Sequence, residues 1–148
     1  MTTSDEIDFP LTAMTKNEEY QIDLSWEPLE IRPDQDTKFI FTIRDGATRE
    51  PLRNSSYDFV LIQNGKEIHK ESDTVKIGGG FIDYKFAEDQ TGPTIVRFEN
   101  IRGTGLQTEF GIVVTPEFNS TFLIMLATVT MMIVFLSYFQ KRKRIYFS

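Results

Sequence analysis

The segment from Phe122 to Phe139 constrains the fold most, because its 18 residues carry no charge. At 1.5 Å per helical residue such a segment spans about 27 Å, close to the hydrocarbon thickness of a bilayer. The alternative is a buried helix of a soluble core, but a chain of 148 residues has little other material to cover it on every side. The sequence therefore predicts one transmembrane helix over residues 122–140, surrounded by the lipid bilayer.

Four consecutive basic residues follow this segment and predict its direction across the membrane. They are Lys141, Arg142, Lys143 and Arg144. Lys and Arg beside a short tail are retained on the cytoplasmic side. We therefore expect residues 141–148 to form a basic cytoplasmic tail, and the N-terminal domain of this single-pass protein to be extracytoplasmic.

The charge of the chain divides at the same point. All 22 Asp and Glu residues precede Phe118, where 12 Lys and Arg accompany them, so this part has a formal net charge of −10. Such a domain would repel phosphates, and nucleic acid is not expected as a partner. The chain has no cysteine. Disulfides, thiolate metal sites and a catalytic thiol are thereby excluded, and the domain must be held together by its core.

Residues 1–18 are polar and acidic and predict a flexible or loosely docked leader. They lack the basic start and apolar run of a signal peptide, although an exported N-terminal domain normally requires one. Three explanations stay open: Met1 is not the start of the precursor, the chain inserts as a tail-anchored protein, or the domain is cytoplasmic. The positive-inside rule argues against the third, and we prefer the first.

Residues 19–115 contain short runs in which apolar and polar residues alternate, the pattern of half-buried strands. The runs are Tyr20–Trp26, Phe39–Ile43, Tyr57–Leu61, Phe81–Phe86, Ile95–Phe98 and Phe110–Val114. Asn64-Gly65 stands between two further apolar stretches and predicts a hairpin with a type I′ turn. Gly78–Gly80 is expected to be a flexible connection. Trp26 is expected to fill the core.

Seven or so short strands, with turn residues every 8 to 14 positions, predict an all-β domain. The expected fold is an antiparallel β-sandwich of immunoglobulin or fibronectin III type with Greek-key connections, followed by the C-terminal transmembrane helix. No segment before Phe118 has a 3.6-residue apolar period, so almost no helix is expected there.

Several segments of the predicted sandwich carry a family resemblance. They are Ile22–Leu24, Glu27–Pro33, Thr37–Ile43, Tyr57–Val60 and Asn64–Ile68. Together they resemble small Ig-like surface domains of ammonia-oxidising and related archaea. This resemblance implies an exported surface protein.

A second resemblance concerns the junction at residues 116–121. Pro116, Glu117 and Phe118, followed by the apolar helix and the basic cluster, are similar to the PEF-type C-terminal sorting signal of archaeal exported proteins. In that family a membrane-embedded archaeosortase reads the signal, cleaves near the motif and transfers the protein to another anchor. The resemblance therefore implies an alternative in which the helix is removed.

Residues that carry chemistry are few. His69 is the only histidine, and we expect it on the outer side of the strand that follows Asn64-Gly65. Copper and structural zinc sites need several imidazoles or thiolates, which one chain with a single histidine cannot supply. Asp34, Asp36 and Asp89 could together hold Ca²⁺, although solvated turn acids are the simpler interpretation. We therefore predict no catalytic residue, no cofactor and no metal site.

Two sequons offer sites for N-linked glycosylation, at Asn54 and Asn119. Asn54 lies in a predicted loop and is the better candidate, since Asn119 lies beside the membrane segment. A glycoprotein is therefore predicted.

The helix carries a stripe of small residues at spacings of three, four and three. The residues are Ala127, Thr130, Val134 and Ser137. Such a stripe lets helices approach closely in lipid. The alternative is that the Ser and Thr hydroxyls only bond to carbonyls of their own helix.

These features predict a non-enzymatic role. The expected protein is an extracytoplasmic interaction or structural module, either an accessory subunit of a membrane complex or a cell-surface protein. Its protein partners would contact the transmembrane helix and a face of the sandwich. The alternative from another class is a metal-binding or metal-delivery domain that uses His69 and the acidic loops.

Overall fold

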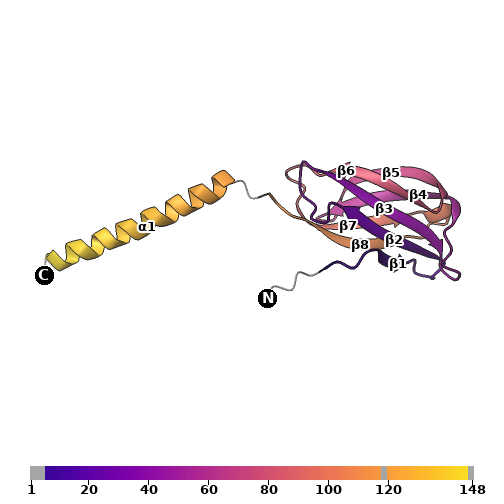
Figure 1. The fold of residues 1–148 in the computed structure, drawn as a ribbon, viewed down its shortest axis with the longest axis horizontal. Coiled ribbons are helices and arrows are strands. Elements are labelled where there is room, and N and C mark those ends of the chain that lie inside the picture. Colours follow the sequence, from indigo (N-terminus) through magenta and orange to yellow (C-terminus); the bar gives the residue numbers. More distant parts are fainter. Residues whose placement is uncertain (1–5, 118–119, 147–148) are drawn as a thin grey trace. The chain divides into compact units, whose positions relative to one another are not determined.

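Eight strands and one long helix make up the computed structural model, which describes residues 6–117 and 120–146, with the side chains of residues 6–117 and 124–142 (Figure 1). The chain divides into two compact units, Met1–Pro116 and Glu117–Ser148, and we call the first the β domain. The elements are β1 (Leu11–Met14), β2 (Tyr20–Glu27), β3 (Asp36–Asp45), β4 (Arg53–Gln63), β5 (Lys66–Ile77), β6 (Gly79–Lys85), β7 (Gly92–Glu99), the 3₁₀ turn η1 (Ile101–Gly103), β8 (Thr108–Val114) and α1 (Ser120–Tyr146).

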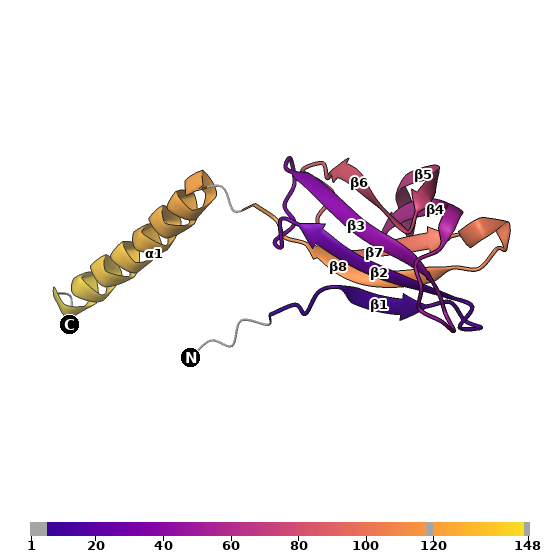
Figure 2. The same cartoon turned by 45° about the vertical axis from the view of Figure 1, so that its right-hand side comes forward.

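The strands form two four-stranded antiparallel sheets. Sheet A has the order β1-β2-β3-β6 and sheet B the order β5-β4-β7-β8. The edge strands β1 and β8 adjoin each other on one side of the domain, as two views show (Figures 1 and 2). The predicted all-β domain with a C-terminal apolar helix is thus confirmed.

Aromatic rings from both sheets fill the space between them. Phe41 of sheet A lies 5.0 Å from Phe98 of sheet B, and Phe39 lies 5.4 Å from Phe59, measured between ring centroids. All four side chains are buried. Alternation along each strand turns these residues inward and the polar ones outward, so the sequence pattern produces the core directly.

The predicted hairpin is confirmed. Asn64 and Gly65 both have positive φ, 51° and 73°, as a type I′ turn requires. A register shift lies between Leu61 and Ile62, where Leu61 pairs with His69 and Ile62 pairs with Glu67. One extra residue, Ile68, therefore stands in β5, which is the geometry of a β-bulge.

The prediction of a flexible leader over residues 1–18 is wrong from residue 11 onward. Leu11–Met14 forms β1 and pairs with β2, Leu11 opposite Leu24 and Met14 opposite Gln21. Leu11 and Ala13 pack against the core, which stabilises this short edge strand.

The interpretation of Gly78–Gly80 as a flexible connection also needs correction, because Gly79 and Gly80 lie inside β6. A Cβ atom on Gly80 would lie 2.7 Å from Cγ1 of Val75 and 3.2 Å from the Phe41 ring. Glycine is needed here because β6 approaches these neighbours too closely for a side chain. Only Gly78, with φ of 60°, serves as the turn.

The helix is longer than predicted, since α1 begins at Ser120 and continues through the basic cluster to Tyr146. Within the described residues, Ile124–Arg142 is long and apolar enough to cross a membrane, and none of its residues is buried. No other element of its own compact unit packs against this apolar helix. Lipid or a partner protein is therefore needed to shield its side chains from water.

One end of the β domain is where the chain leaves β8, and we call it the exit end. Val114 pairs there with Gly92 and forms a parallel bridge with Ile31. The hairpin turn lies at the same end, because Gln63, just before it, donates from Nε2 to the Thr94 hydroxyl at 2.8 Å.

Candidate interaction surface

His69 lies on the core-facing side of β5, so the prediction that it points outward is wrong. It pairs with the buried Leu61, and its ring centroid lies 4.7 Å from that of Tyr84 on β6. Its Nε2 lies 2.7 Å from Glu71 Oε2. The bulge at Ile68 causes the difference, because one extra residue moves every later side chain to the opposite face.

Acidic residues continue along the same face of β5. Glu71 and Asp73 pair with the buried Phe59 and Tyr57. Burial, and then the charges of Asp73 and Glu71, raise the pKa of Tyr57 to about 12. Charged side chains that point inward from an edge strand discourage another strand from pairing with it.

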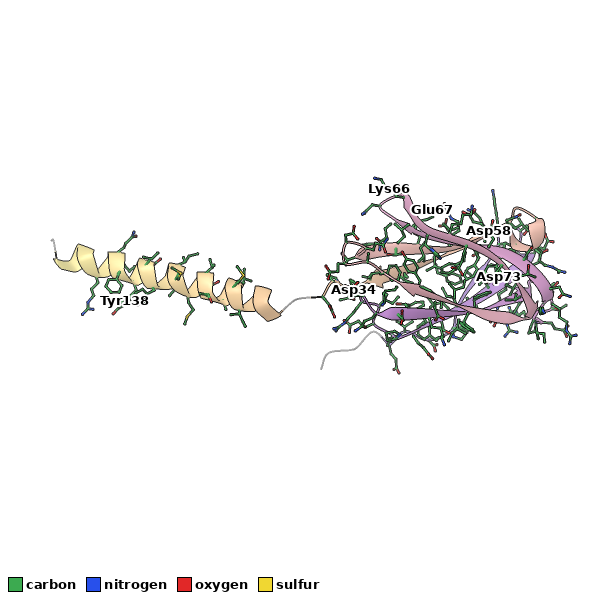
Figure 3. All side chains as sticks on the ribbon, turned by 90° about the horizontal axis from the view of Figure 1, so that it is seen from above. Asp34, Asp58, Lys66, Glu67, Asp73 and Tyr138 are labelled. Carbon is green, nitrogen blue, oxygen red and sulfur yellow. The ribbon has the colours of Figure 1, made fainter. Side chains whose placement is uncertain are left out.

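The three acidic loop residues lie on neighbouring segments at the exit end. The Asp34 N–H donates to the Phe86 carbonyl at 2.8 Å, Asp36 pairs with Lys85, and Asp89 follows in the β6–β7 turn. Asp34 lies at the hairpin end of the domain, away from Asp58 and Asp73 (Figure 3). Among the side chains of residues 6–117 and 124–142, no three of His, Asp or Glu come together as a metal site would require.

Ion pairs cover part of the outer face of sheet B, around Arg97. Arg97 lies 3.2 Å from Glu99 and donates from Nε to Glu109 at 2.7 Å, and Lys70 lies 3.8 Å from Glu99. These side chains cover Val60, which is only 1% exposed although it points away from the core. The face is therefore polar and internally paired around Arg97, whereas Ile62, Ile95 and Val113 make it apolar toward the exit end.

The edge strand β8 has a different character at the exit end. A groove of about 550 Å³ runs beside it, walled by the leader, the β2–β3 loop and β8 itself. Its walls include Trp26, Leu29 and Val113. Leu29 is 54% exposed and Val113 62% exposed. Exposed apolar side chains gathered around a concave site are typical of interaction surfaces.

Trp26 is buried as predicted, but at the rim of the core beneath this groove. Its Nε1 donates to the Leu29 carbonyl at 3.1 Å, and the Phe9 ring packs edge-on against it at 4.7 Å. These contacts fix the β2–β3 loop and the leader on either side of the indole. The groove is thus built on a rigid base.

The glycosylation and sorting residues are described only in part. Asn54 is exposed, but it lies within β4, with φ of 48°, and not in the predicted loop, whereas Asn119 lies outside the described residues. Pro116 and Glu117 are exposed and Phe118 is not described. Lys141 and Arg142 are exposed at the end of the candidate span, and the side chains of Lys143 and Arg144 are not described.

The small stripe of α1 is exposed, and its hydroxyls bond within the helix. Thr130 Oγ1 donates to the Leu126 carbonyl and Ser137 Oγ to the Ile133 carbonyl, both at 2.9 Å. Both hydroxyls therefore have acceptors within their own helix, and the packing role of the stripe stays a prediction. Ala127, Val134 and the carbon atoms of the two hydroxyl residues still give the stripe a shallow surface.

Neither a scan against protein-family models nor a search of curated proteins gave a match for this chain. Sequence reasoning missed the groove, because its walls come from three segments that lie far apart in the chain.

Proposed function

We propose that this chain is a membrane-anchored, extracytoplasmic interaction module, in which a β domain binds protein partners and α1 holds it at the membrane. The observation that carries the proposal is the division into two units. One has a complete core of its own, and the other is a helix whose candidate span has no buried residue. Such a helix is explained by lipid around it.

We assign the β domain to the immunoglobulin and fibronectin III type of sandwich. The order β5-β4-β7-β8 corresponds to the C′, C, F and G strands of that architecture. In sheet A, β2, β3 and β6 correspond to strands A, B and E, and β1 is an additional edge strand. Domains of this type serve mainly to present binding surfaces, which supports a non-enzymatic role by analogy.

The proposed direction places the β domain outside and the C-terminus in the cytoplasm. It rests on the basic cluster that starts with the exposed Lys141 and Arg142. The exposed side chain of Asn54, the acceptor of the first sequon, agrees with an extracytoplasmic domain that is glycosylated. A partner helix would contact the stripe of Ala127, Thr130, Val134 and Ser137, as an accessory subunit of a membrane complex requires.

A second candidate is a surface protein processed by an archaeosortase. Its support is the position of Pro116 and Glu117, which are exposed and are followed, after residues 118–119, by α1. An exposed segment between two compact units is accessible to a protease. The metal-delivery alternative gains no comparable support from the described side chains.

Labelling with a membrane-impermeant thiol reagent tests the proposed topology. The chain has no cysteine, so a single one can be introduced without background. On intact cells we expect labelling of Glu67→Cys, in the exposed hairpin, and no labelling of Ser148→Cys until the cells are opened (Figure 3). The reverse pattern would place the β domain in the cytoplasm and overturn the proposal.

A further inference from the structure

The free edge of β8 offers main-chain hydrogen bonds to another strand. β8 is the last strand of sheet B, and the Thr115 N–H points away from β7, donating to the Ile31 carbonyl at 2.8 Å. Strand alternation gives the same direction to the N–H groups of Val113, Gly111 and Glu109. Of these residues, Gly111 and Val113 line the groove, and this stretch of β8 lies between the Ile31 bridge at one end and the contact of Thr108 with Met14 at the other.

Gly111 has no evident role within the β domain. A Cβ added to it would meet nothing within 4 Å, and no register shift interrupts the pairing of β7 with β8. Glycine inside a strand commonly marks a bulge or the close approach of another backbone. A side chain at this position would point to the outer face of sheet B, as those of Glu109 and Val113 do, so Gly111 is not required for a strand to dock at the β8 edge.

The walls and the rim of the groove define the chemistry of the occupant. An added strand on β8 would turn alternate side chains toward Trp26 and Leu29, and these side chains should be apolar. Glu30 lines the groove, and the exposed Glu6 and Asp8 flank the lining residue Ile7 in the chain, so we infer an acidic rim. Among the described residues, only Glu30 of these has an ion-pair partner, Arg32 at 3.0 Å. A basic segment would complement this rim.

Other occupants fit this surface less well. A second copy of the chain would bring the same carboxylates against each other, which repels. A lipid surface supplies no main-chain partner for the β8 edge and leaves its hydrogen-bonding groups unsatisfied. Of the other three edge strands, β5 carries inward acids, β1 has only four residues, and β6 contributes no residue to the groove.

We propose that β8 is the docking edge of this protein, and that it binds an extended partner segment of alternating apolar and basic residues as an added strand of sheet B. This inference rests on the proposed function, of which it names the binding surface and the class of partner. The apolar side chains fill the groove, and the basic ones face the acidic rim.

The test uses the full chain in nanodiscs of uncharged lipid and a fluorescent ten-residue peptide of alternating lysine and valine. We expect saturable binding, slower amide exchange at Glu109, Gly111 and Val113, and weaker binding at high salt. Gly111→Pro removes only an outward N–H, so it should leave the ladder to β7 intact and weaken binding at least about tenfold. Gly111→Ala adds a methyl group to open space and should bind within about twofold of the wild type.

Leu29→Asn keeps the test decisive if Gly111→Pro lowers thermal stability, because Leu29 is largely exposed and its replacement should weaken binding without unfolding the domain. A glutamate-valine peptide should not bind. The proposal is overturned if the lysine-valine peptide fails to bind, binds empty nanodiscs equally, protects amides elsewhere, or binds both variants as well as the wild type. None of these outcomes changes the topology result, so the two proposals fail separately.

Discussion

At the scale of single residues, Asp23 shows how one side chain ties three strands together. It accepts hydrogen bonds from Gln21 at 2.9 Å, from Arg44 on β3 at 2.7 Å, and from Thr12 on β1 at 3.0 Å. Partial burial alone would raise its pKa, but these donors hold the pKa below the ordinary value of 3.8. Asp23 therefore stabilises the short β1 against sheet A in its charged form.

Asp23→Asn is expected to lower the free energy of unfolding at pH 7 by about 1–2 kcal/mol, since it weakens charge-assisted hydrogen bonds. A carboxyl whose pKa is lower in the folded state stabilises above its unfolded pKa and loses this effect as pH falls through the folded pKa. The difference between variant and wild type should therefore shrink below pH 3.8, in urea titrations of residues 1–116. Equal losses at pH 7 and pH 2 would contradict an electrostatic role. Glu67→Gln, in the exposed hairpin, serves as control.

At the scale of elements, the alternation of apolar and polar residues predicted the strands that depend on local sequence. It missed the features that depend on how strands pair with one another. The strands β2–β8 were predicted because each must turn an apolar face inward. β1 was missed because four residues carry too little pattern, and its order comes from the free edge of β2. The face of His69 was missed because the bulge at Ile68 is set by the pairing of β4 with β5.

Gly80 gives an element-scale prediction about the approach of β6 to its neighbours. Gly80→Ala places a Cβ atom 2.7 Å from Val75 Cγ1 and close to the Phe41 ring, both buried, so these side chains must shift. We expect a loss of about 1–3 kcal/mol in the free energy of unfolding. Chemical denaturation of residues 1–116 measures it.

The matched control is Gly111→Ala in β8, where the new methyl group meets nothing within 4 Å. Its unfolding free energy should change by less than about 0.5 kcal/mol. Equal losses of unfolding free energy in Gly80→Ala and Gly111→Ala would show that close packing of β6 against Val75 is not the reason for glycine at position 80. The pair therefore separates packing at β6 from the general effect of replacing glycine in a strand.

At the scale of the whole molecule, the sequence predicted the long apolar helix and the charge division but not the groove beside β8. The apolar segment and the basic cluster are continuous in the chain, and their meaning follows from length and charge alone. The groove beside β8 joins Ile7 of the leader, Leu29 of the β2–β3 loop and Val113. Only folding brings these segments together, so no local pattern could have indicated the surface.

Whether α1 is retained or cleaved off distinguishes a permanent subunit from a processed surface protein. The last prediction concerns this point in the complete chain. We expect intact-mass spectrometry of protein from native membranes to find the full C-terminus, including Lys141–Arg144, because the exposed apolar side chains of α1 are stable only in lipid or against a partner helix. A mass that ends close to Phe118 would instead support cleavage by a sortase. Glu117→Ala provides the control. It should leave the mass of an unprocessed protein changed only by the substitution, whereas in a processed protein it would restore the missing helix and basic tail.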